Sequence, residues 1–331
     1  MTAEGASQRG TSEERTEARN HAGEQGVSGT VLREVAAVQT SDGAVLHATV
    51  DGRADALVTV VLAHGWTLAQ AAWDDVAELL HPRAAAGGLR VVRYDQRGHG
   101  RSTWGPDDTD ITVDRLGEDL GDLLDQLVPE GPVVLGGHSM GGMTIMCLAA
   151  ARPELFGDRV TGVALVSTSA GDLRQGPFER ITPGMLSAAL AGAWFVERVR
   201  ALLPPAHPRH QAMVRNFLYG ADATDQMVRD GAEIMHASTV RALVEFLPAL
   251  GDHDKHAELT ALAGVPVEIL VGDTDRLTPA RHSRRMADAL PDARLQVVPR
   301  TGHMLPQERP GLVADAIGRL VAASADRAAR A

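Results

Sequence analysis

Short apolar runs that alternate with amphipathic segments constrain the fold of this chain more than any other feature. Six near-continuous apolar runs are separated mainly by segments in which apolar residues recur every three or four positions. Such runs are typical of strands buried on both faces of a parallel sheet, and the segments between them suit crossover helices. We therefore expect an α/β fold with a doubly wound, mostly parallel sheet. The six runs read ALVTVVLAHG, LRVVRYDQRG, GPVVLGGHS, RVTGVALVSTS, GVPVEILVGD and ARLQVVPRTGH.

The sheet is expected to begin with an antiparallel hairpin, because two alternating runs flank Ser41-Asp42-Gly43. Between residues 171 and 262 the alternation stops, and proline-containing helical patterns replace the strands. We interpret residues 171–262 as a helical cap inserted into a core made of residues 29–170 and 263–331. The polar residues 1–28 are expected to form a disordered tail.

Composition and charge exclude several other classes of protein. The chain has 43 acidic and 32 basic residues and no basic cluster, which disfavours nucleic-acid binding. No run of about 18 or more uncharged apolar residues predicts a membrane span. The tail lacks the apolar centre of a secretory signal, so we expect a cytoplasmic protein. With Lys255 as the only lysine among many arginines, alanines and glycines, the composition suggests a GC-rich bacterial genome.

The glycine-rich stretch Gly136–Gly142 follows an apolar run and precedes a helical pattern. It contains Gly-x-Ser-x-Gly, and the strand before it and the helix after it are the context in which such a serine is a nucleophile. The alternative is an ordinary glycine-rich turn. In the first interpretation Ser139 sits on a strained turn that exposes its hydroxyl, and the N–H of Met140 points toward the same spot.

A serine nucleophile needs a base and a carboxylate that orients the base, in the chain order Ser, acid, His. Asp273 and Asp275 come just after one predicted strand and His303 just after the last one. The alternative is that these are ordinary loop residues. Spacing alone does not decide which aspartate faces His303. A tetrahedral intermediate also needs two N–H donors, for which we predict Met140 and Trp66, the latter in the loop after ALVTVVLAHG.

Together these motifs resemble the α/β-hydrolase superfamily, in particular its capped esterases, lipases and cofactor-free haloperoxidase-like members. The resemblance runs from Val31 to the last predicted helix. It implies a nucleophilic Ser139, a general base and acid His303, an orienting Asp275, and oxyanion donors Trp66 and Met140. It gives His99 and Arg97 no catalytic role and lets His138 pack on neighbouring loops. The matching stretches are HGW at 64–66, YDQRGHGRS at 94–102, GHSMGG at 137–142, GDTDRLTP at 272–279 and GHMLPQERP at 302–310.

Apolar residues of the cap are expected mostly to form its own core, while the remainder line an apolar pocket. The candidates for the pocket are Trp194, Phe195, Met213 and Phe217. Cys147 is expected to be a buried hydrophobe in an apolar helix. We predict a serine hydrolase that cleaves a small carboxylic ester with an apolar acyl or alcohol part through an acyl-enzyme. It is expected to use no metal and no cofactor; its oligomeric state is open.

Several alternatives share this fold. Epoxide hydrolases and dehalogenases carry an aspartate where this chain has Ser139, and epoxide hydrolases need two cap tyrosines where this cap has only Tyr219. Proline iminopeptidases have a different oxyanion loop. The same triad could instead serve an acyltransferase, a cyclase, a perhydrolase or haloperoxidase, or a carbon–carbon hydrolase. A ligand receptor without turnover is a further alternative, which the intact Ser139, Asp275 and His303 disfavour.

Overall fold

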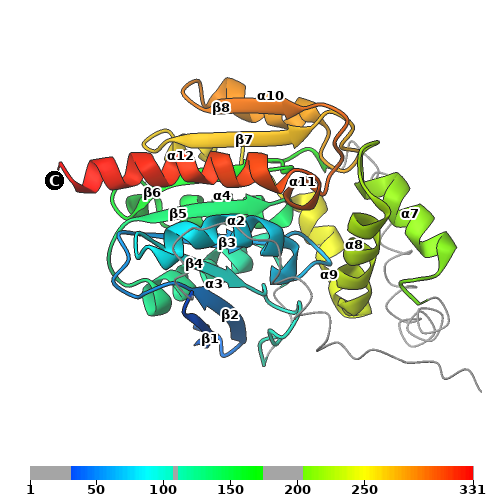
Figure 1. Cartoon of the computed structure of the whole chain (residues 1–331), viewed down its shortest axis with the longest axis horizontal. Coiled ribbons are helices and arrows are strands. Elements are labelled where there is room, and N and C mark those ends of the chain that lie inside the picture. Colours follow the sequence, from blue (N-terminus) through cyan, green and yellow to red (C-terminus); the bar gives the residue numbers. More distant parts are fainter. Residues whose placement is uncertain (1–30, 107–110, 174–203, 331) are drawn as a thin grey trace, which may run out of the picture. The chain divides into compact units, whose positions relative to one another are not determined.

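The computed structural model describes residues 31–106, 111–173 and 204–330. At its centre lies an eight-stranded sheet with the order β1-β2-β4-β3-β5-β6-β7-β8 (Figure 1). The pairs β1–β2 and β2–β4 are antiparallel and the others parallel, as predicted. The strands are β1 (Arg33–Gln39), β2 (Val45–Asp51), β3 (Val58–Ala63), β4 (Leu89–Tyr94), β5 (Val133–His138), β6 (Val160–Val166), β7 (Val267–Gly272) and β8 (Arg294–Val298).

The predicted hairpin is present between β1 and β2. The turn is closed by the Thr40 N–H, which donates to the Ala44 carbonyl oxygen at 2.8 Å. Gly43 within it has φ +91°, a conformation that a residue without Cβ adopts at little cost. This register pairs Val38 with Leu46, and both side chains are buried in the core.

The central parallel strands are buried on both faces because helices cover each face, whereas the edge strand β8 is only partly buried. Along β3, the side chains of Val58, Val60 and Leu62 enter one apolar cluster, and those of Val61 and Ala63 enter the other. The first cluster is closed by α2 (Asp74–Ala85) and α12 (Pro310–Ala328), which pack on each other (Figure 1). The second is closed by α3 (Val113–Leu127), α4 (Met140–Ala151) and α10 (Ala280–Ala289).

Threonine side chains mark where three of the helices begin. In each, the hydroxyl oxygen accepts a hydrogen bond from the backbone N–H three residues further on, which satisfies one of the donors that a helix start leaves unpaired. These caps are Thr112 before α3, Thr224 before α8 (Asp225–Ala237) and Thr239 before α9 (Val240–Asp252). Four short helices are also present: η1 (Gln70–Trp73), η2 (Pro153–Leu155), η4 (Glu258–Leu262) and α11 (Leu305–Glu308).

Residues 171–262, which we call the insertion, separate β6 from β7. Its described part, 171–173 and 204–262, holds α7 (Pro208–Leu218), α8, α9 and η4 and no strand. Apolar residues of α7 and α8 form a cluster of their own that also takes in Leu68 and Met304 from the core loops. The helices of the insertion thus pack against the loops that follow β3 and β8.

Parallel strands end at one edge of the sheet, and that edge gathers the residues singled out by the sequence. Trp66 follows β3, Ser139 follows β5, Asp275 follows β7 and His303 follows β8. In open α/β sheets, ligands bind at this carboxyl edge. Among the described helices none is long and apolar enough to cross a membrane.

Candidate active site

Ser139 lies on the sharp turn between β5 and α4, with φ 53° and ψ −119°. A non-glycine residue rarely adopts a positive φ, so the predicted strain is present at this serine. Two glycines make the turn possible. A Cβ on Gly137 would lie 2.5 Å from the carbonyl oxygen of Gly141, and a Cβ on Gly141 would clash with the backbone of Ala63. Only glycine leaves room for the strand and helix to meet this closely.

His303 and Asp275 form a buried pair. The imidazole Nδ1 lies 2.9 Å from Asp275 Oδ2, and each residue is 4% exposed. Asp275 also accepts hydrogen bonds from the N–H groups of Leu277 and Thr278 and from the Thr278 hydroxyl, each at 2.9 Å. Burial alone would raise the pKa of Asp275, but His303 and these donors outweigh it and hold the pKa below its usual value. Asp275 is therefore ionised, and its carboxylate holds the imidazole of His303 through Nδ1.

The structure brings Asp275, and not Asp273, into contact with His303. Asp273 is exposed, and its carboxylate accepts a hydrogen bond from the Thr301 N–H at 3.3 Å. It therefore braces the loop that leads to His303. Thr278 was missed by the sequence reasoning, although a hydroxyl residue three positions after an aspartate is a common partner for a carboxylate at a turn.

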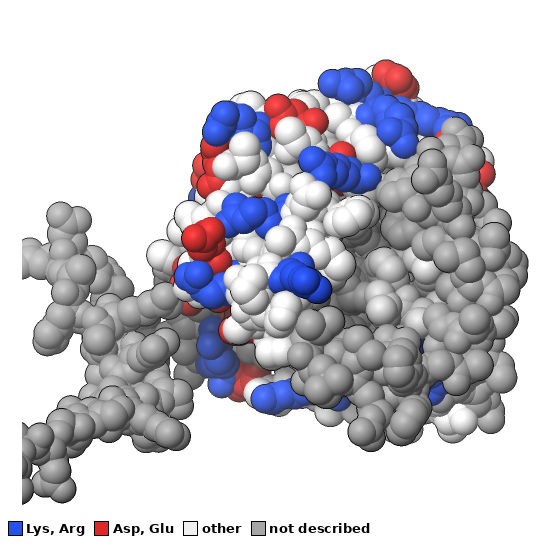
Figure 2. All heavy atoms as spheres, turned by 90° about the vertical axis from the view of Figure 1, so that its right-hand side faces the viewer, with Lys and Arg blue, Asp and Glu red and all other residues white. Residues whose placement is uncertain are grey.

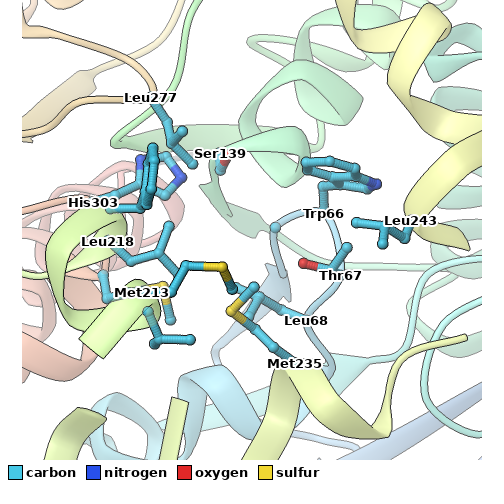
Figure 3. A pocket seen from close by; sticks show the side chains of 14 residues that line it. Trp66, Thr67, Leu68, Ser139, Met213, Leu218, Met235, Leu243, Leu277 and His303 are labelled. Atoms are coloured by element: carbon cyan, nitrogen blue, oxygen red, sulfur yellow. The ribbon is translucent and has the colours of Figure 1, made fainter. Parts of the chain in front are cut away.

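Ser139 and His303 line one cavity. In the view of Figure 3, Ser139 lies between the imidazole of His303 and the ring of Trp66. Among the described residues no hydrogen bond joins Ser139 Oγ to the imidazole. Contacts between a nucleophile and its base are often long when no substrate is bound and shorten in the complex.

The cavity has a volume of about 300 Å³ and a lining that is almost entirely apolar. Its walls come from the loop after β3, from α7, α8 and α9, and from residues next to Asp275 and His303 (Figure 3). The apolar members are Trp66, Leu68, Met213, Val214, Phe217, Leu218, Met235, Leu243, Leu277 and Met304. A cavity with a mostly apolar lining and a few polar side chains is typical of a site that binds a small molecule.

Two of the four predicted pocket residues line this cavity. Met213 and Phe217 lie one turn apart on α7, and they are 49% and 51% exposed, so they border both the cavity and solvent. Trp194 and Phe195 lie outside the described residues.

The two predicted oxyanion donors lie near Ser139: Met140 directly follows it, and Trp66 lines the same cavity. Met140 is the first residue of α4, where a helix leaves backbone N–H groups without intrahelical partners. Trp66 lies in the loop after β3, and its indole Nε1 donates to the Ala242 carbonyl oxygen of α9 at 2.9 Å. The next residue, Thr67, has φ 58° and donates its N–H to His99 Nε2 at 3.2 Å.

Buried neutral histidines and their hydrogen-bond partners hold the loop that contains Trp66. Burial lowers the pKa of His99 to about 3, so its ring is neutral and can accept from Thr67. His64 Nε2 accepts from the Gln96 N–H at 2.9 Å, and Gln96 Oε1 accepts from the Thr144 hydroxyl at 2.7 Å. The stretch that contains Gln96 and His99 therefore holds this loop through buried hydrogen bonds.

His138, directly before Ser139, contacts the backbone of His303. Its Nε2 lies 2.9 Å from the His303 carbonyl oxygen, and because a carbonyl only accepts, Nε2 carries the proton. Burial and the neighbouring His303 lower the pKa of His138 to about 3. His138 was expected only to pack on neighbouring loops; the structure shows that it ties the Ser139 turn to the His303 loop.

Cys147 is buried within α4, as predicted, and burial raises the pKa of its thiol. A thiol that stays protonated is a poor nucleophile. Across residues 31–106, 111–173 and 204–330, no group of three or more His, Cys, Asp or Glu side chains could hold a metal ion.

A mostly parallel eight-stranded sheet with a strained serine between β5 and α4, and a His–Asp pair after the last two strands, is the architecture of an α/β hydrolase. The chain belongs to the Alpha/beta hydrolase family, which matches residues 60–316.

Individual relatives have low sequence identity to this chain. The sn-1-specific diacylglycerol lipase ABHD11 of Mus musculus is 27% identical over 279 residues, covering 80% of this chain and 81% of that protein. The monoacylglycerol lipase of Mycolicibacterium smegmatis is 29% identical over 251 residues, covering 74% and 80%. A thermophilic esterase from Thermogutta terrifontis superposes with a TM-score of 0.65 at 24% identity, covering 86% of this chain and 97% of its own. At this low identity, the similarity to the esterase supports the fold alone.

Proposed function

We propose that this protein is a serine hydrolase that cleaves carboxylic esters with an apolar acyl or alcohol part. The observation that carries the proposal is that Ser139, on a strained turn, and His303, bonded to Asp275 at 2.9 Å, open into one apolar cavity of about 300 Å³. The lipases among the relatives support an ester substrate.

Acylation begins when Ser139 Oγ attacks the ester carbonyl carbon while His303 Nε2 takes the hydroxyl proton. The carbonyl oxygen becomes an oxyanion that accepts hydrogen bonds from the N–H groups of Trp66 and Met140. As the carbon–oxygen bond to the alcohol breaks, His303 returns the proton to the leaving oxygen. Asp275 stabilises the imidazolium that forms in between.

Deacylation repeats these steps with water as the nucleophile. His303 takes a proton from water, the hydroxide oxygen attacks the acyl carbon, and the proton returns to Ser139 Oγ as the acid leaves. The mechanism uses side chains, backbone N–H groups and water alone, without a metal or an organic cofactor.

The insertion acts as a cap that selects the substrate, because α7, α8 and α9 contribute apolar side chains to the cavity. Figure 2 shows the face of the molecule on the side of these helices, where basic and acidic side chains are interspersed with uncharged surface. Few polar atoms line the cavity, so burial of a hydrocarbon group supplies most of the affinity. The core with residues 29–170 and 263–331 supplies the chemistry.

Intact-mass analysis after treatment with a fluorophosphonate tests the nucleophile. We expect one adduct on the wild-type protein and none on Ser139→Ala, together with loss of turnover on a panel of chromogenic esters of increasing chain length. An adduct on Cys147 instead of Ser139, or the absence of any adduct on the wild-type protein, would refute the mechanism. An adduct without ester turnover would favour one of the other chemistries of this triad, such as acyl transfer or carbon–carbon cleavage, or a ligand receptor.

A further inference from the structure

A backbone junction joins the insertion to the loop of His303. The carbonyl oxygen of Leu218, the last residue of α7, accepts hydrogen bonds from the N–H groups of His303 at 2.6 Å and Met304 at 3.1 Å. Leu218 also lines the cavity. The C-terminal end of α7 is therefore bonded directly to the backbone that carries the imidazole.

Glu308 in α11 bonds both sides of this junction. Its Oε1 accepts from the Gly302 N–H at 2.9 Å, next to His303, and its Oε2 accepts from the Gly220 N–H at 2.7 Å, just after α7. The residue is 3% exposed, and no basic side chain among the described residues bonds its carboxylate. Each oxygen thus holds a different segment of the chain.

Two glycines bring these segments into direct backbone contact. A Cβ on Gly302 would lie 2.5 Å from the Leu218 carbonyl oxygen, and a Cβ on Gly220 would clash with the Arg300 carbonyl oxygen. No side chain separates the two backbones, so a shift of one is transmitted to the other.

We propose that Glu308 is a positioning residue that holds the imidazole of His303 and the α7 wall of the cavity in one fixed arrangement. The inference rests on the proposed function. Burying a carboxylate is unfavourable, and burial raises the pKa of Glu308, although the Gly220 and Gly302 N–H groups and the nearby charge of Arg309 partly offset this. The two hydrogen bonds explain why a carboxylate occupies this place. A carboxylate offers one acceptor oxygen to the Gly302 N–H and one to the Gly220 N–H, whereas the amide of glutamine has only one oxygen.

The test compares Glu308→Gln with Asp222→Asn. Asp222 lies on the same connection after α7 and accepts hydrogen bonds from Arg300, before His303, and from Arg309, after α11, at 2.7 and 2.8 Å, but it is exposed. We expect Glu308→Gln to lower kcat for a small acetate ester about 10- to 100-fold. Its KM for that ester and its melting temperature should change little, because the loss of one hydrogen bond is offset by the loss of a buried charge.

Asp222→Asn should leave kcat within about twofold of wild type. Equal losses in both variants, or a loss of kcat in Glu308→Gln that only follows the unfolded fraction, would overturn the proposal. If Glu308→Gln does not fold, Glu308→Asp carries the same test, because it keeps the charge but shortens the reach.

A second measurement separates this proposal from the proposed function. The proton on His303 Nδ1, bonded to Asp275, should give a downfield proton resonance, identified by its absence in Asp275→Asn. We expect that resonance to broaden or move in Glu308→Gln and to stay in place in Asp222→Asn, whether or not the protein turns over esters. An unchanged resonance in Glu308→Gln would refute the positioning role, whereas absent turnover in wild type would refute only the proposed function.

Discussion

The two walls of the cavity are held in different ways. On the sheet side, Ser139 and His303 are fixed by a strained backbone, by close glycine contacts and by buried hydrogen bonds such as that of His303 with Asp275. On the insertion side, α7 and α8 present apolar side chains that pack in a small cluster of their own, and Met213 and Phe217 are half exposed.

Under the proposed function, this difference assigns the chemistry to the sheet wall and the selection of substrate to the α7 wall. Polar groups of the sheet wall have partners at fixed distances, so a small displacement there costs catalysis. The C-terminal end of α7 is hydrogen-bonded to the His303 loop, but the side chains of Met213 and Phe217 make non-directional contacts and are half exposed. These side chains can therefore change size at little cost to the fold. The predictions below test whether the two walls are independent in this way.

The largest effect is expected from the carboxylate behind His303. Asp275→Asn should lower ester turnover by about 10⁴, because the ring loses the acceptor that fixes its tautomer and stabilises its charged form. Asp273→Asn, which alters only a loop contact with Thr301, should keep near-normal turnover. Steady-state kinetics of both variants, with circular dichroism to confirm folding, make the comparison. Near-normal activity in both would exclude the proposed triad.

The contact between His303 and Asp275 also shows which part of the site the sequence could not predict. The strand endings predicted that an aspartate and His303 would meet at one edge of the sheet. In an extended chain Asp273 and Asp275 point to the same face, so spacing could not separate them. The turn at Thr278 separates them, since Asp275 is held there by the Leu277 and Thr278 N–H groups while Asp273 remains exposed.

The fold was more predictable than the support of the site. All six near-continuous apolar runs became strands, most of them buried on both faces, whereas the last one became the partly exposed edge strand β8. The glycines around Ser139 correctly predicted a turn that tolerates no Cβ. The bonds of His138 to the His303 carbonyl and of Glu308 to Gly220 and Gly302 join residues far apart in the chain. Such long-range contacts have no local pattern, so only the folded arrangement reveals them.

Acid should destabilise the protein, in part through buried histidines that support the sheet wall. Burial lowers the pKa of His99 and His138 to about 3 and that of His253 to about 4. The unfolded chain binds more protons than the folded one below the ordinary pKa of about 6.5, so stability is present above that pH and is lost as the pH falls. Asp119, whose pKa is raised to about 6 by burial, opposes this below pH 6.

Among these four groups the net loss is about 3 kcal/mol per pH unit below pH 6. The lowered pKa values of His64 and His282 add to this loss, and the raised pKa values of Asp74 and Glu308 oppose it. By pH 4 this loss amounts to about 6 kcal/mol, so a domain at the lower end of the usual stability range of about 5 to 15 kcal/mol should unfold near pH 4. Urea titrations from pH 7 to 4 measure the slope. His138→Gln, which keeps a donor for the His303 carbonyl but does not titrate, should move the acid transition to lower pH. A transition at the same pH would show that the neutral state of His138 adds no stability.

The smallest effect is expected at the α7 wall, where Phe217 borders both the cavity and solvent. Phe217→Ala enlarges the cavity, so the preferred ester should become longer, with kcat/KM ratios between long and short chains changing about 10-fold. Turnover of a small acetate ester should stay within about threefold of wild type, because Ser139, His303 and Asp275 keep their contacts. Met213→Ala, one turn away on α7, should change the ratios in the same direction. Measurement over the chain-length panel distinguishes two outcomes. A change in the ratios means that the α7 side chains select the substrate independently of the chemistry. An equal loss on every ester would mean that a change at Phe217 is transmitted to His303 through the Leu218 hydrogen bonds.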